Sequence, residues 1–263
     1  MPDVQSDLRR VKLSFGRSAK DYAKHGTLQK EVSQYLVRVF VSPEIGSAPR
    51  ILDVGCGTGF TSVEIQRKWP NASLAAIDIA APMALQTKRA GIKNVAAADA
   101  ATLPFKKSSF DLVISSLAFQ WISHDERLFP AIARLLSPGG RLYFSTLGPG
   151  TLSELQQAYD RASRECTGKP ALFRPMMGKD NLLELMSRAG FIDRFTLFKT
   201  MVRSYPSVRT LFKILKGVGA TMPGRPDNPP RRDVLARTVE LYSQKNESVE
   251  ATYELLYVSG RLA

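Results

Sequence analysis

The chain has 263 residues, of which 44% are hydrophobic and 23% charged, with a net charge of +13, so it has the length and composition of one large globular domain with an added subdomain. No apolar run approaches the ~20 residues of a membrane span, the first ten residues lack the apolar core of a secretory signal, and two cysteines with two histidines are too few for a standard structural zinc site. We therefore expect a reduced, cytoplasmic protein that holds no metal.

The N-terminal part is expected to be helical and is followed by a repeating pattern of strands and helices. Residues 5–40 have helical character with a break near 24–27, and residues 42–49 form a linker rich in Pro, Gly and Ser. Beyond it, strands are expected at 50–54, 73–79, 95–98, 110–116 and 141–146. Helices are expected at 60–69, 82–90 and 125–136, and a turn at 137–140. This alternation predicts an α/β fold with a parallel, doubly wound, Rossmann-like sheet.

The pattern changes after residue 150. Helices are expected at 152–166, 180–190, 208–218 and 234–242, strands at 191–201 and 251–259, and a proline-rich loop at 222–230. An antiparallel pair, with helices inserted before the last strand, would complete a sheet of seven strands. We divide the chain into an N-terminal helical lid (1–49), a cofactor-binding core (50–150) and a C-terminal part for substrate docking (151–263).

The most informative segment is the run Ile51-Leu52-Asp53-Val54-Gly55-Cys56-Gly57-Thr58-Gly59. An apolar strand ends in an acid and then in three alternating glycines, which allow a tight turn and the close approach of a ligand. The spacing differs from the dinucleotide pattern Gly-x-Gly-x-x-Gly, because Phe60 stands where the third glycine belongs. The turn therefore favours a cofactor without a pyrophosphate, and Asp53 is placed to contact an amino group of that cofactor.

Acids also follow the next two strands. Asp78 is placed to accept hydrogen bonds from two ribose hydroxyls, and Asp99 lies where an adenine amino group is expected. Met83 is placed to pack on the adenine face. The alternative is a turn that binds phosphate or no ligand. The cofactor is expected to contact Gln29, Asp53, Gly55, Cys56, Gly57, Gly59, Asp78, Ile79, Met83, Asp99, Ala100, Ser115, Leu117 and Gln120.

Residues 50–146 resemble the class I S-adenosylmethionine methyltransferases. In that family the acid that matches Asp78 binds both ribose hydroxyls and the acid that matches Asp99 reaches the adenine, so the resemblance implies these roles and S-adenosylmethionine as the cofactor. Enzymes that methylate exocyclic base amines carry Asn/Asp-Pro-Pro-Tyr/Phe after the fourth strand. The run here is Ser115-Ser116-Leu117-Ala118-Phe119-Gln120-Trp121, which counts against base methylation.

Three further segments narrow the family. Phe15, Ala19, Tyr22, Gly26 and Gln29 would share one helix face and form a lid over the ligand, with a simple packing helix as the alternative. The run 144–155 reads as a strand, a Gly-Pro-Gly turn and a helix that begins with a Thr–Glu capping box. The third segment is Leu-Lys-Gly-Val-Gly-Ala-Thr at 215–221.

With Leu-Ala-Phe-Gln-Trp at 117–121, these segments resemble the malonyl-acyl carrier protein O-methyltransferases of biotin synthesis. The resemblance implies methylation of the free carboxylate of a malonyl thioester, so that fatty-acid synthesis can extend the chain toward pimelate. The carrier protein is acidic. A cationic enzyme, with nine Lys or Arg against two acids between residues 199 and 237, would attract it.

A malonyl carboxylate is ionised at pH 7, so no general base is required. Tyr22 is the candidate catalytic residue, as a hydrogen-bond donor to the carboxylate or a cover for the methionyl end of the cofactor. Arg17, Arg174 and Lys216 are candidates to hold the carboxylate, and Trp121 to line the cavity. Two rival functions stay open. One is a small-molecule C- or O-methyltransferase acting on a quinone or a free acid, and the other is an RNA-binding or RNA-modifying protein, which the lack of a recognised RNA module disfavours.

Overall fold

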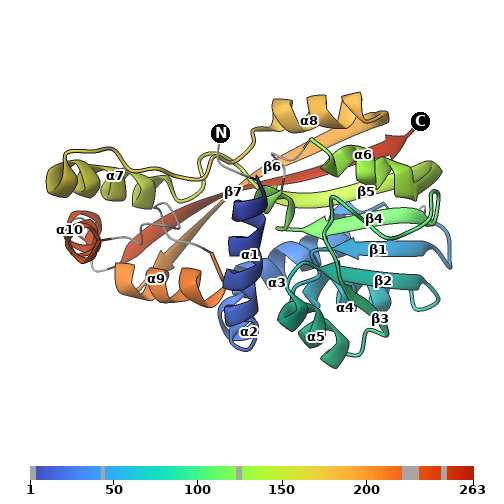
Figure 1. Ribbon diagram of the computed structural model, residues 1–263, viewed down its shortest axis with the longest axis horizontal. Helices are drawn as coiled ribbons and strands as arrows, with labels where there is room; N and C mark the ends of the chain where they lie inside the picture. The colour runs from blue at the N-terminus through green and yellow to red at the C-terminus, as the bar shows by residue number, and fades with distance from the viewer. Residues whose placement is uncertain (1–3, 43–44, 123–125, 221–230, 244–247) are drawn as a thin grey trace.

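The computed structural model describes residues 4–42, 45–122, 126–220, 231–243 and 248–263. Its strands form one mixed sheet of seven, in the order β3-β2-β1-β4-β5-β7-β6 (Figure 1). The strands are β1 Arg50–Val54, β2 Ser73–Asp78, β3 Asn94–Ala97, β4 Phe110–Ser116, β5 Leu136–Leu147, β6 Phe191–Tyr205 and β7 Val249–Leu262. The first five are parallel, and β7 runs antiparallel to both of its neighbours. The predicted doubly wound sheet of seven strands is confirmed.

Strand β1 is the point where the winding of the sheet reverses. It pairs with β2 on one side and with β4 on the other, and the chain builds outward in both directions from it. In open α/β sheets ligands bind beyond the carboxyl ends of the strands at such a reversal. The end of β1 is the Gly55–Gly59 turn, so the topology places the predicted motif at the expected ligand site.

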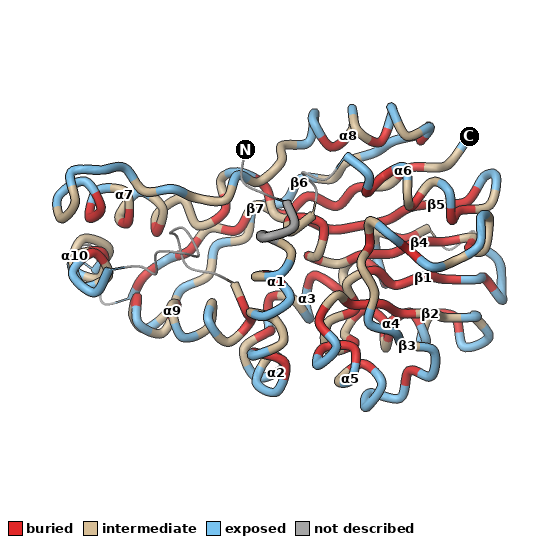
Figure 2. The backbone as a smooth tube through the Cα atoms, viewed as in Figure 1, coloured by how far each residue is buried: buried red, intermediate tan, exposed pale blue. Residues whose placement is uncertain are grey.

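Helices cover both faces of the sheet because apolar side chains point alternately to each face. Ile51 of β1 packs with one core and Leu52 with the other, and both are fully buried. Figure 2 shows the resulting buried strands between exposed helix surfaces. One face carries α3 Thr27–Tyr35, a π-helical turn Leu36–Phe40 and α4 Phe60–Lys68, the other carries α6 Leu128–Leu135 and α8 Lys179–Arg188, and α5 Ala81–Arg89 packs beside β2 and β3.

The N-terminal segment forms separate short helices rather than one continuous helix. Helix α1 spans Val4–Ser18 and α2 spans Tyr22–His25, and Gly26 separates α2 from α3. Helix α1 lies across the end of the parallel strands (Figure 1). The predicted break near 24–27 is therefore present, and a second break follows Ser18. Phe15, Ala19 and Tyr22 still gather in one small cluster, which also holds Met83 of α5.

Strands β6 and β7 continue beyond the rest of the sheet. Residues 249–254 of β7 pair only with β6, because β5 pairs no further along β7 than Leu255. We call these residues, their partners on β6 and the three helices around them the extension (Figure 1). Its helices are α7 Ser153–Thr167, α9 Val208–Gly217 and α10 Arg232–Ser243, and α7 packs on α10 through Tyr159, Ala162 and Val234.

Several boundaries differ from prediction. Strand β6 runs to Tyr205 rather than 201, β5 takes in the predicted turn at 137–140, and α6 begins at Leu128. The proline-rich loop predicted at 222–230 lies outside the described residues. Among the described helices, none combines the length and the apolar character that crossing a bilayer requires.

The predicted capping box at α7 is wrong. The residue before the helix is Leu152, with a left-handed φ of 56°, and no side chain caps it. Thr151 Oγ1 accepts a hydrogen bond from the Glu254 backbone N–H at 3.1 Å, and the Glu154 carboxylate accepts one from the Thr252 backbone N–H at 3.1 Å. Both polar side chains therefore attach the helix to β7 instead of closing its own first turn.

Candidate functional site

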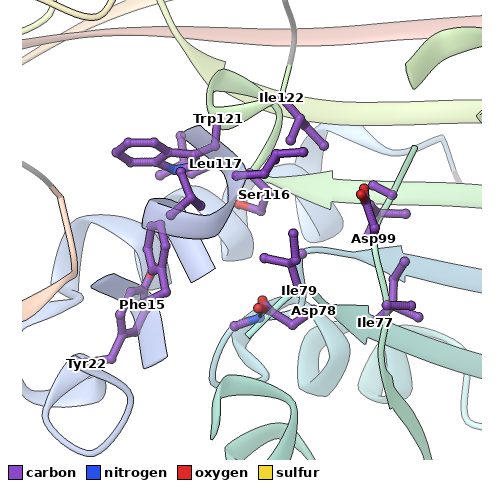
Figure 3. Close-up of a pocket in the computed structure, with 18 residues that line it drawn as sticks. Phe15, Tyr22, Ile77, Asp78, Ile79, Asp99, Ser116, Leu117, Trp121 and Ile122 are labelled. Carbon is purple, nitrogen blue, oxygen red and sulfur yellow. Dashed lines mark hydrogen bonds between the residues drawn. The ribbon is translucent and has the colours of Figure 1, made fainter. Parts of the chain in front are cut away.

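A cavity lies at the carboxyl ends of β1, β2 and β4, beneath α1 and α2 (Figure 3). The predicted site residues that line it are Tyr22, Gly55, Gly57, Asp78, Ile79, Asp99, Ala100, Leu117 and Trp121. Segments separated by up to a hundred residues in the sequence thus meet around one space.

The glycine turn keeps its backbone close to the cavity. Gly55 has a left-handed φ of 73°, and its N–H donates to the Ile77 carbonyl at 2.8 Å. A Cβ added to Gly55 would lie 2.3 Å from Cβ of Ala118, so a side chain at this position meets both backbone strain and a collision. The requirement for glycine here follows from the approach of the β4 loop and from the turn itself.

Asp78 is fixed by the backbone on both of its carboxylate oxygens. Oδ2 accepts from the Gly57 N–H at 2.9 Å and Oδ1 from the Ala80 N–H at 2.8 Å. The side chain is buried, and this burial raises its pKa. Each oxygen retains a further lone pair, and Asp78 lines the cavity, so the carboxylate is held in place to accept hydrogen bonds from a ligand.

Asp99 is oriented in the same way at the neighbouring strand end. Its Oδ1 accepts from the Ala101 N–H at 2.8 Å, and the residue lines the cavity. Figure 3 shows Asp78, Ile79 and Asp99 along one side of the space and Phe15, Tyr22 and Trp121 along the other. A ligand between these walls meets carboxylates on one side and rings on the other.

Asp53 lies beneath the turn rather than in the cavity wall. It is fully buried, and its Oδ2 accepts from Ser62 Oγ at 2.5 Å, whereas its Oδ1 has no hydrogen-bond partner among the described residues. Burial is the main cause that raises the pKa of Asp53 to about 7, and the nearby carboxylate of Asp78 adds to the rise. A buried carboxylate with one unpartnered oxygen favours a cationic ligand nearby.

The charge of the cavity lining does not favour a phosphate group. Among the described residues that line it, Asp78 and Asp99 are the charged ones, and none is Lys or Arg. Two carboxylates favour a ligand with cationic groups and free ribose hydroxyls. Within the described part of the chain no group of three or more His, Cys, Asp or Glu could hold a metal ion.

Aromatic rings from the N-terminal helices close the cavity. Phe15 packs edge-on against Trp121 with ring centroids 5.3 Å apart, and Tyr22 lies 6.4 Å from Phe15 and 6.3 Å from Phe60. The Tyr22 hydroxyl forms no hydrogen bond to a described residue, and burial, followed by the negative charge of Asp78, raises its pKa. Tyr22 therefore stays protonated at neutral pH, as a donor and not a base.

Other predicted cofactor residues lie behind the cavity wall. Cys56 is buried beside Ala76 and Ile92, and Gly59 begins α4 with a left-handed φ of 94°. Met83 is fully buried in the small cluster under α1 and α2. The remaining predictions outside the lining are Ser115, which is fully buried, Gln120, whose Oε1 accepts from Thr146 Oγ1 at 3.2 Å, and Gln29, whose Oε1 is buried without a described partner.

The three cations predicted to hold the substrate carboxylate differ in their distance from the cavity wall. Arg174 lies over the Trp121 ring, with its guanidinium carbon 5.5 Å from the centroid, and donates to the Trp121 carbonyl at 3.2 Å. Arg17 and Lys216 are exposed and are not part of the lining. Arg174 is thus the candidate that touches the cavity wall.

Some residues that line the cavity were not predicted from the sequence. Leu8 and Val11 line the cavity, and the spacing of 8, 11 and 15 along α1 is the helical pattern that would have found them. Ser116 also lines it and belongs to a hydroxyl chain in which Thr61 donates to Ser33, Ser33 to Ser116, and Ser116 pairs with Ser145, each at 3.1 Å. No local sequence motif predicts this series of hydrogen-bonded hydroxyls, because its members come from four separate elements.

Comparison with known proteins matches this architecture. Residues 52–144 match the model of a methyltransferase domain. A malonyl-[acyl-carrier protein] O-methyltransferase of Geobacter sulfurreducens is 30% identical, with 97% of this chain and 99% of the relative covered, and that of Methylococcus capsulatus is 35% identical, with 94% and 91% covered. The chain belongs to the malonyl-[acyl-carrier protein] O-methyltransferase family. The resemblance found in the sequence is confirmed.

Among solved structures, this family member is similar to phosphoethanolamine N-methyltransferase 2 of Haemonchus contortus in complex with S-adenosyl-L-methionine. The TM-score is 0.54 at 18% identity, and 88% of this chain and 52% of that chain are covered. At this level of identity the likeness concerns the fold. It agrees with the seven-stranded sheet described above.

Proposed function

We propose that this protein is a cytoplasmic enzyme that transfers a methyl group from S-adenosylmethionine to the free carboxylate of a malonyl thioester on acyl carrier protein. The product would be a methyl ester that hides the charge of the carboxylate, as biotin synthesis requires. The carrier protein would bind transiently, through its acidic surface.

One observation carries the proposal beyond the methyltransferase core. The relatives match the lid and the extension as well as residues 52–144. Two segments specific to the resemblance, 205 residues apart in the chain, touch beside the cavity: Ser14 Oγ of α1 donates to the Gly219 carbonyl at 2.9 Å. This contact supports a role for both segments in binding the substrate.

The cavity fits S-adenosylmethionine by its hydrogen-bond acceptors and its charge. Asp78 is positioned for the ribose hydroxyls and Asp99 for the adenine end, while the buried oxygen of Asp53 favours the cationic methionyl end. When bound, the cofactor supplies an electrophilic methyl group on a sulfonium. The absence of Lys and Arg from the described lining agrees with a cofactor of this charge.

The chain itself has to orient the acceptor and exclude water. A malonyl carboxylate is already ionised at neutral pH, so no residue has to remove a proton. Tyr22, which remains protonated, is placed to donate a hydrogen bond, and the rings of Phe15 and Trp121 remove solvent from the reacting groups. Arg174, against Trp121, is placed to hold the distal carboxylate oxygen.

The test is transfer from S-adenosylmethionine labelled in its methyl group to malonyl-carrier protein, with free malonate and a quinone as alternative acceptors. We expect a base-labile methyl ester on the malonyl-carrier protein. Succinyl-carrier protein serves as the control for chain length. Label on malonate or the quinone without label on the carrier protein would contradict the proposal and favour a small-molecule methyltransferase.

A further inference from the structure

The cations between residues 199 and 237 differ in whether their charge is already matched. Arg203 pairs with Glu31, Arg231 with Asp233, and Arg237 with both Glu165 and Glu240 at 2.6 and 2.8 Å. Lys199 lies 4.3 Å above the ring of Tyr35. These partners weaken the attraction of such residues for an anion on another molecule. The basic residues that form one cluster in the sequence therefore differ in the folded protein.

Helix α9 contains cations whose charge is not matched in this way by described residues. Arg209, Lys213 and Lys216 are exposed, and none of them has an ion pair or hydrogen bond with a described residue. Their spacing of four and three residues puts them on one face, and α9 contains no acid. The opposite face of the helix is anchored in the core by buried side chains, namely Val208 and Leu211. On α10, Arg232 is a further exposed cation, but it stands alone beside the Arg231–Asp233 pair.

The cationic face of α9 ends at the lid. The end of α9 lies so close to α2 that a Cβ on Gly217 would be 2.2 Å from Cδ2 of His25. Two residues further along the chain, a Cβ on Gly219 would lie 2.8 Å from Ser18 Oγ and 3.0 Å from the Phe15 ring. Phe15 is itself part of the cavity wall. An anionic protein on α9 would therefore lie close to the wall of the cavity that Phe15 forms.

We infer that the Arg209–Lys213–Lys216 face of α9 is the docking surface for an acidic carrier protein, and that it positions the thioester arm of the carrier at the edge of the lid. The inference rests on the proposed function. It also assigns Lys216 to the partner protein instead of the substrate carboxylate. Charge complementarity is what selects the occupant, because an exposed helix face with three unmatched cations attracts an anionic surface and not an apolar one.

The test compares two doubly neutralised variants with the parent enzyme. R209Q/K213Q removes one Arg and one Lys from the α9 face. K88Q/R89Q removes the same two charges from the exposed end of α5, where neither side chain has a described ion pair. Each protein is assayed with malonyl-carrier protein and with malonyl-pantetheine, which carries no protein and no phosphate, at low and high salt.

For R209Q/K213Q we expect the KM for malonyl-carrier protein to rise about tenfold at low salt, since each exposed charge contact contributes only modestly. The difference should shrink near 1 M salt, where the screening length is about 3 Å. Rates on malonyl-pantetheine should equal those of the parent, and K88Q/R89Q should match the parent on both substrates.

Equal effects of the two variants on the carrier substrate would overturn the docking surface and leave the proposed function standing. A loss on malonyl-pantetheine equal to the loss on malonyl-carrier protein would also overturn it, because the residues would then act on the small substrate. If the parent forms no methyl ester on malonyl-carrier protein, the proposed function fails, and the docking inference fails with it.

Discussion

The cofactor edge and the extension are built from the same sheet but on opposite plans. At the cofactor edge, short parallel strands end close together, and the ends of β1 to β4 each contribute residues to the cavity, such as Gly55, Asp78 and Asp99. In the extension, two long antiparallel strands leave the sheet and carry helices on their flanks. The first region holds its ligand through backbone geometry, and the second presents a charged helix surface.

The difference shows that local sequence encodes the two regions unequally. A turn that must approach a ligand depends on residues adjacent in the chain, so it leaves a readable motif. A docking surface depends on which cations find partners after folding, as the contrast between Arg237 and Lys213 shows. If this comparison is right, changes at the cofactor edge affect every acceptor, whereas changes on α9 affect only the carrier-bound one.

The largest effect is expected from Gly55→Ala. The new Cβ would meet Ala118 at 2.3 Å on a backbone with φ of 73°, so the free energy of unfolding should fall by ~4 kcal/mol, from strain and overpacking together. Urea unfolding measures it. Gly139→Ala is the matched control, because Gly139 has φ of 74° and a Cβ added to it would meet nothing within 4 Å. Its free energy of unfolding should fall only by the cost of the backbone strain. Equal losses would contradict the close packing at Gly55.

Asp78→Asn should weaken S-adenosylmethionine binding about a hundredfold with the fold retained. The amide has a single acceptor oxygen and an NH2 group that can only donate, and charged hydrogen bonds of this kind contribute ~1.5–3 kcal/mol each. Calorimetric titration gives the Kd. Asp193→Asn, at an exposed ion pair with Arg261, should leave the Kd unchanged. The methyl-transfer activity of Asp78→Asn must also fall with all acyl acceptors. A fall confined to the carrier substrate would contradict the distinction between the two regions.

Tyr22→Phe should lower kcat about tenfold, because one hydrogen bond to the acceptor or cofactor is lost while the ring packing against Phe15 and Phe60 stays. Steady-state rates on malonyl-carrier protein and malonyl-pantetheine should fall together. Tyr159→Phe, in the α7–α10 contact away from the cavity, is the control. An unchanged kcat would remove Tyr22 from the mechanism.

The smallest effect is a pH dependence of cofactor affinity. Burial raises the pKa of Asp53 from 3.8 to about 7, so the unliganded protein binds a proton that a cationic cofactor would displace. The Kd should therefore tighten several-fold as the pH rises from about 5.5 to about 7, below the titration of the cofactor's own amino group. The same raised pKa makes the free energy of unfolding fall as pH rises through the window between 4 and 7.

Asp53→Asn should bind more weakly at neutral pH and with a flatter pH dependence. Asp78, whose pKa burial also raises, stays in place in this variant and accounts for any remaining slope. A slope as steep as that of the parent would show that Asp53 is not the linked group.

The parallel core was predictable because hydrophobic runs, prolines and glycines mark its strands and helices one by one. The Gly55–Gly59 turn and the acids at 78 and 99 could be placed for the same reason. Other features depend on distant partners. Thr151 and Glu154 read as a helix cap but bond to β7, and β6 extends to Tyr205 because β7 pairs with it as far as Val249. Arg17 and Lys216 show that a cation near a motif in sequence need not reach the cavity.

The two thiols of the chain differ enough to be addressed separately. Cys56 is buried in the glycine turn, and burial raises its pKa, so it is a poor nucleophile toward maleimides. Cys166, near the end of α7, is partly exposed and free. A single fluorophore can therefore be attached to the extension of the unmodified protein, away from the cofactor turn, and can report the arrival of a partner by its change in anisotropy.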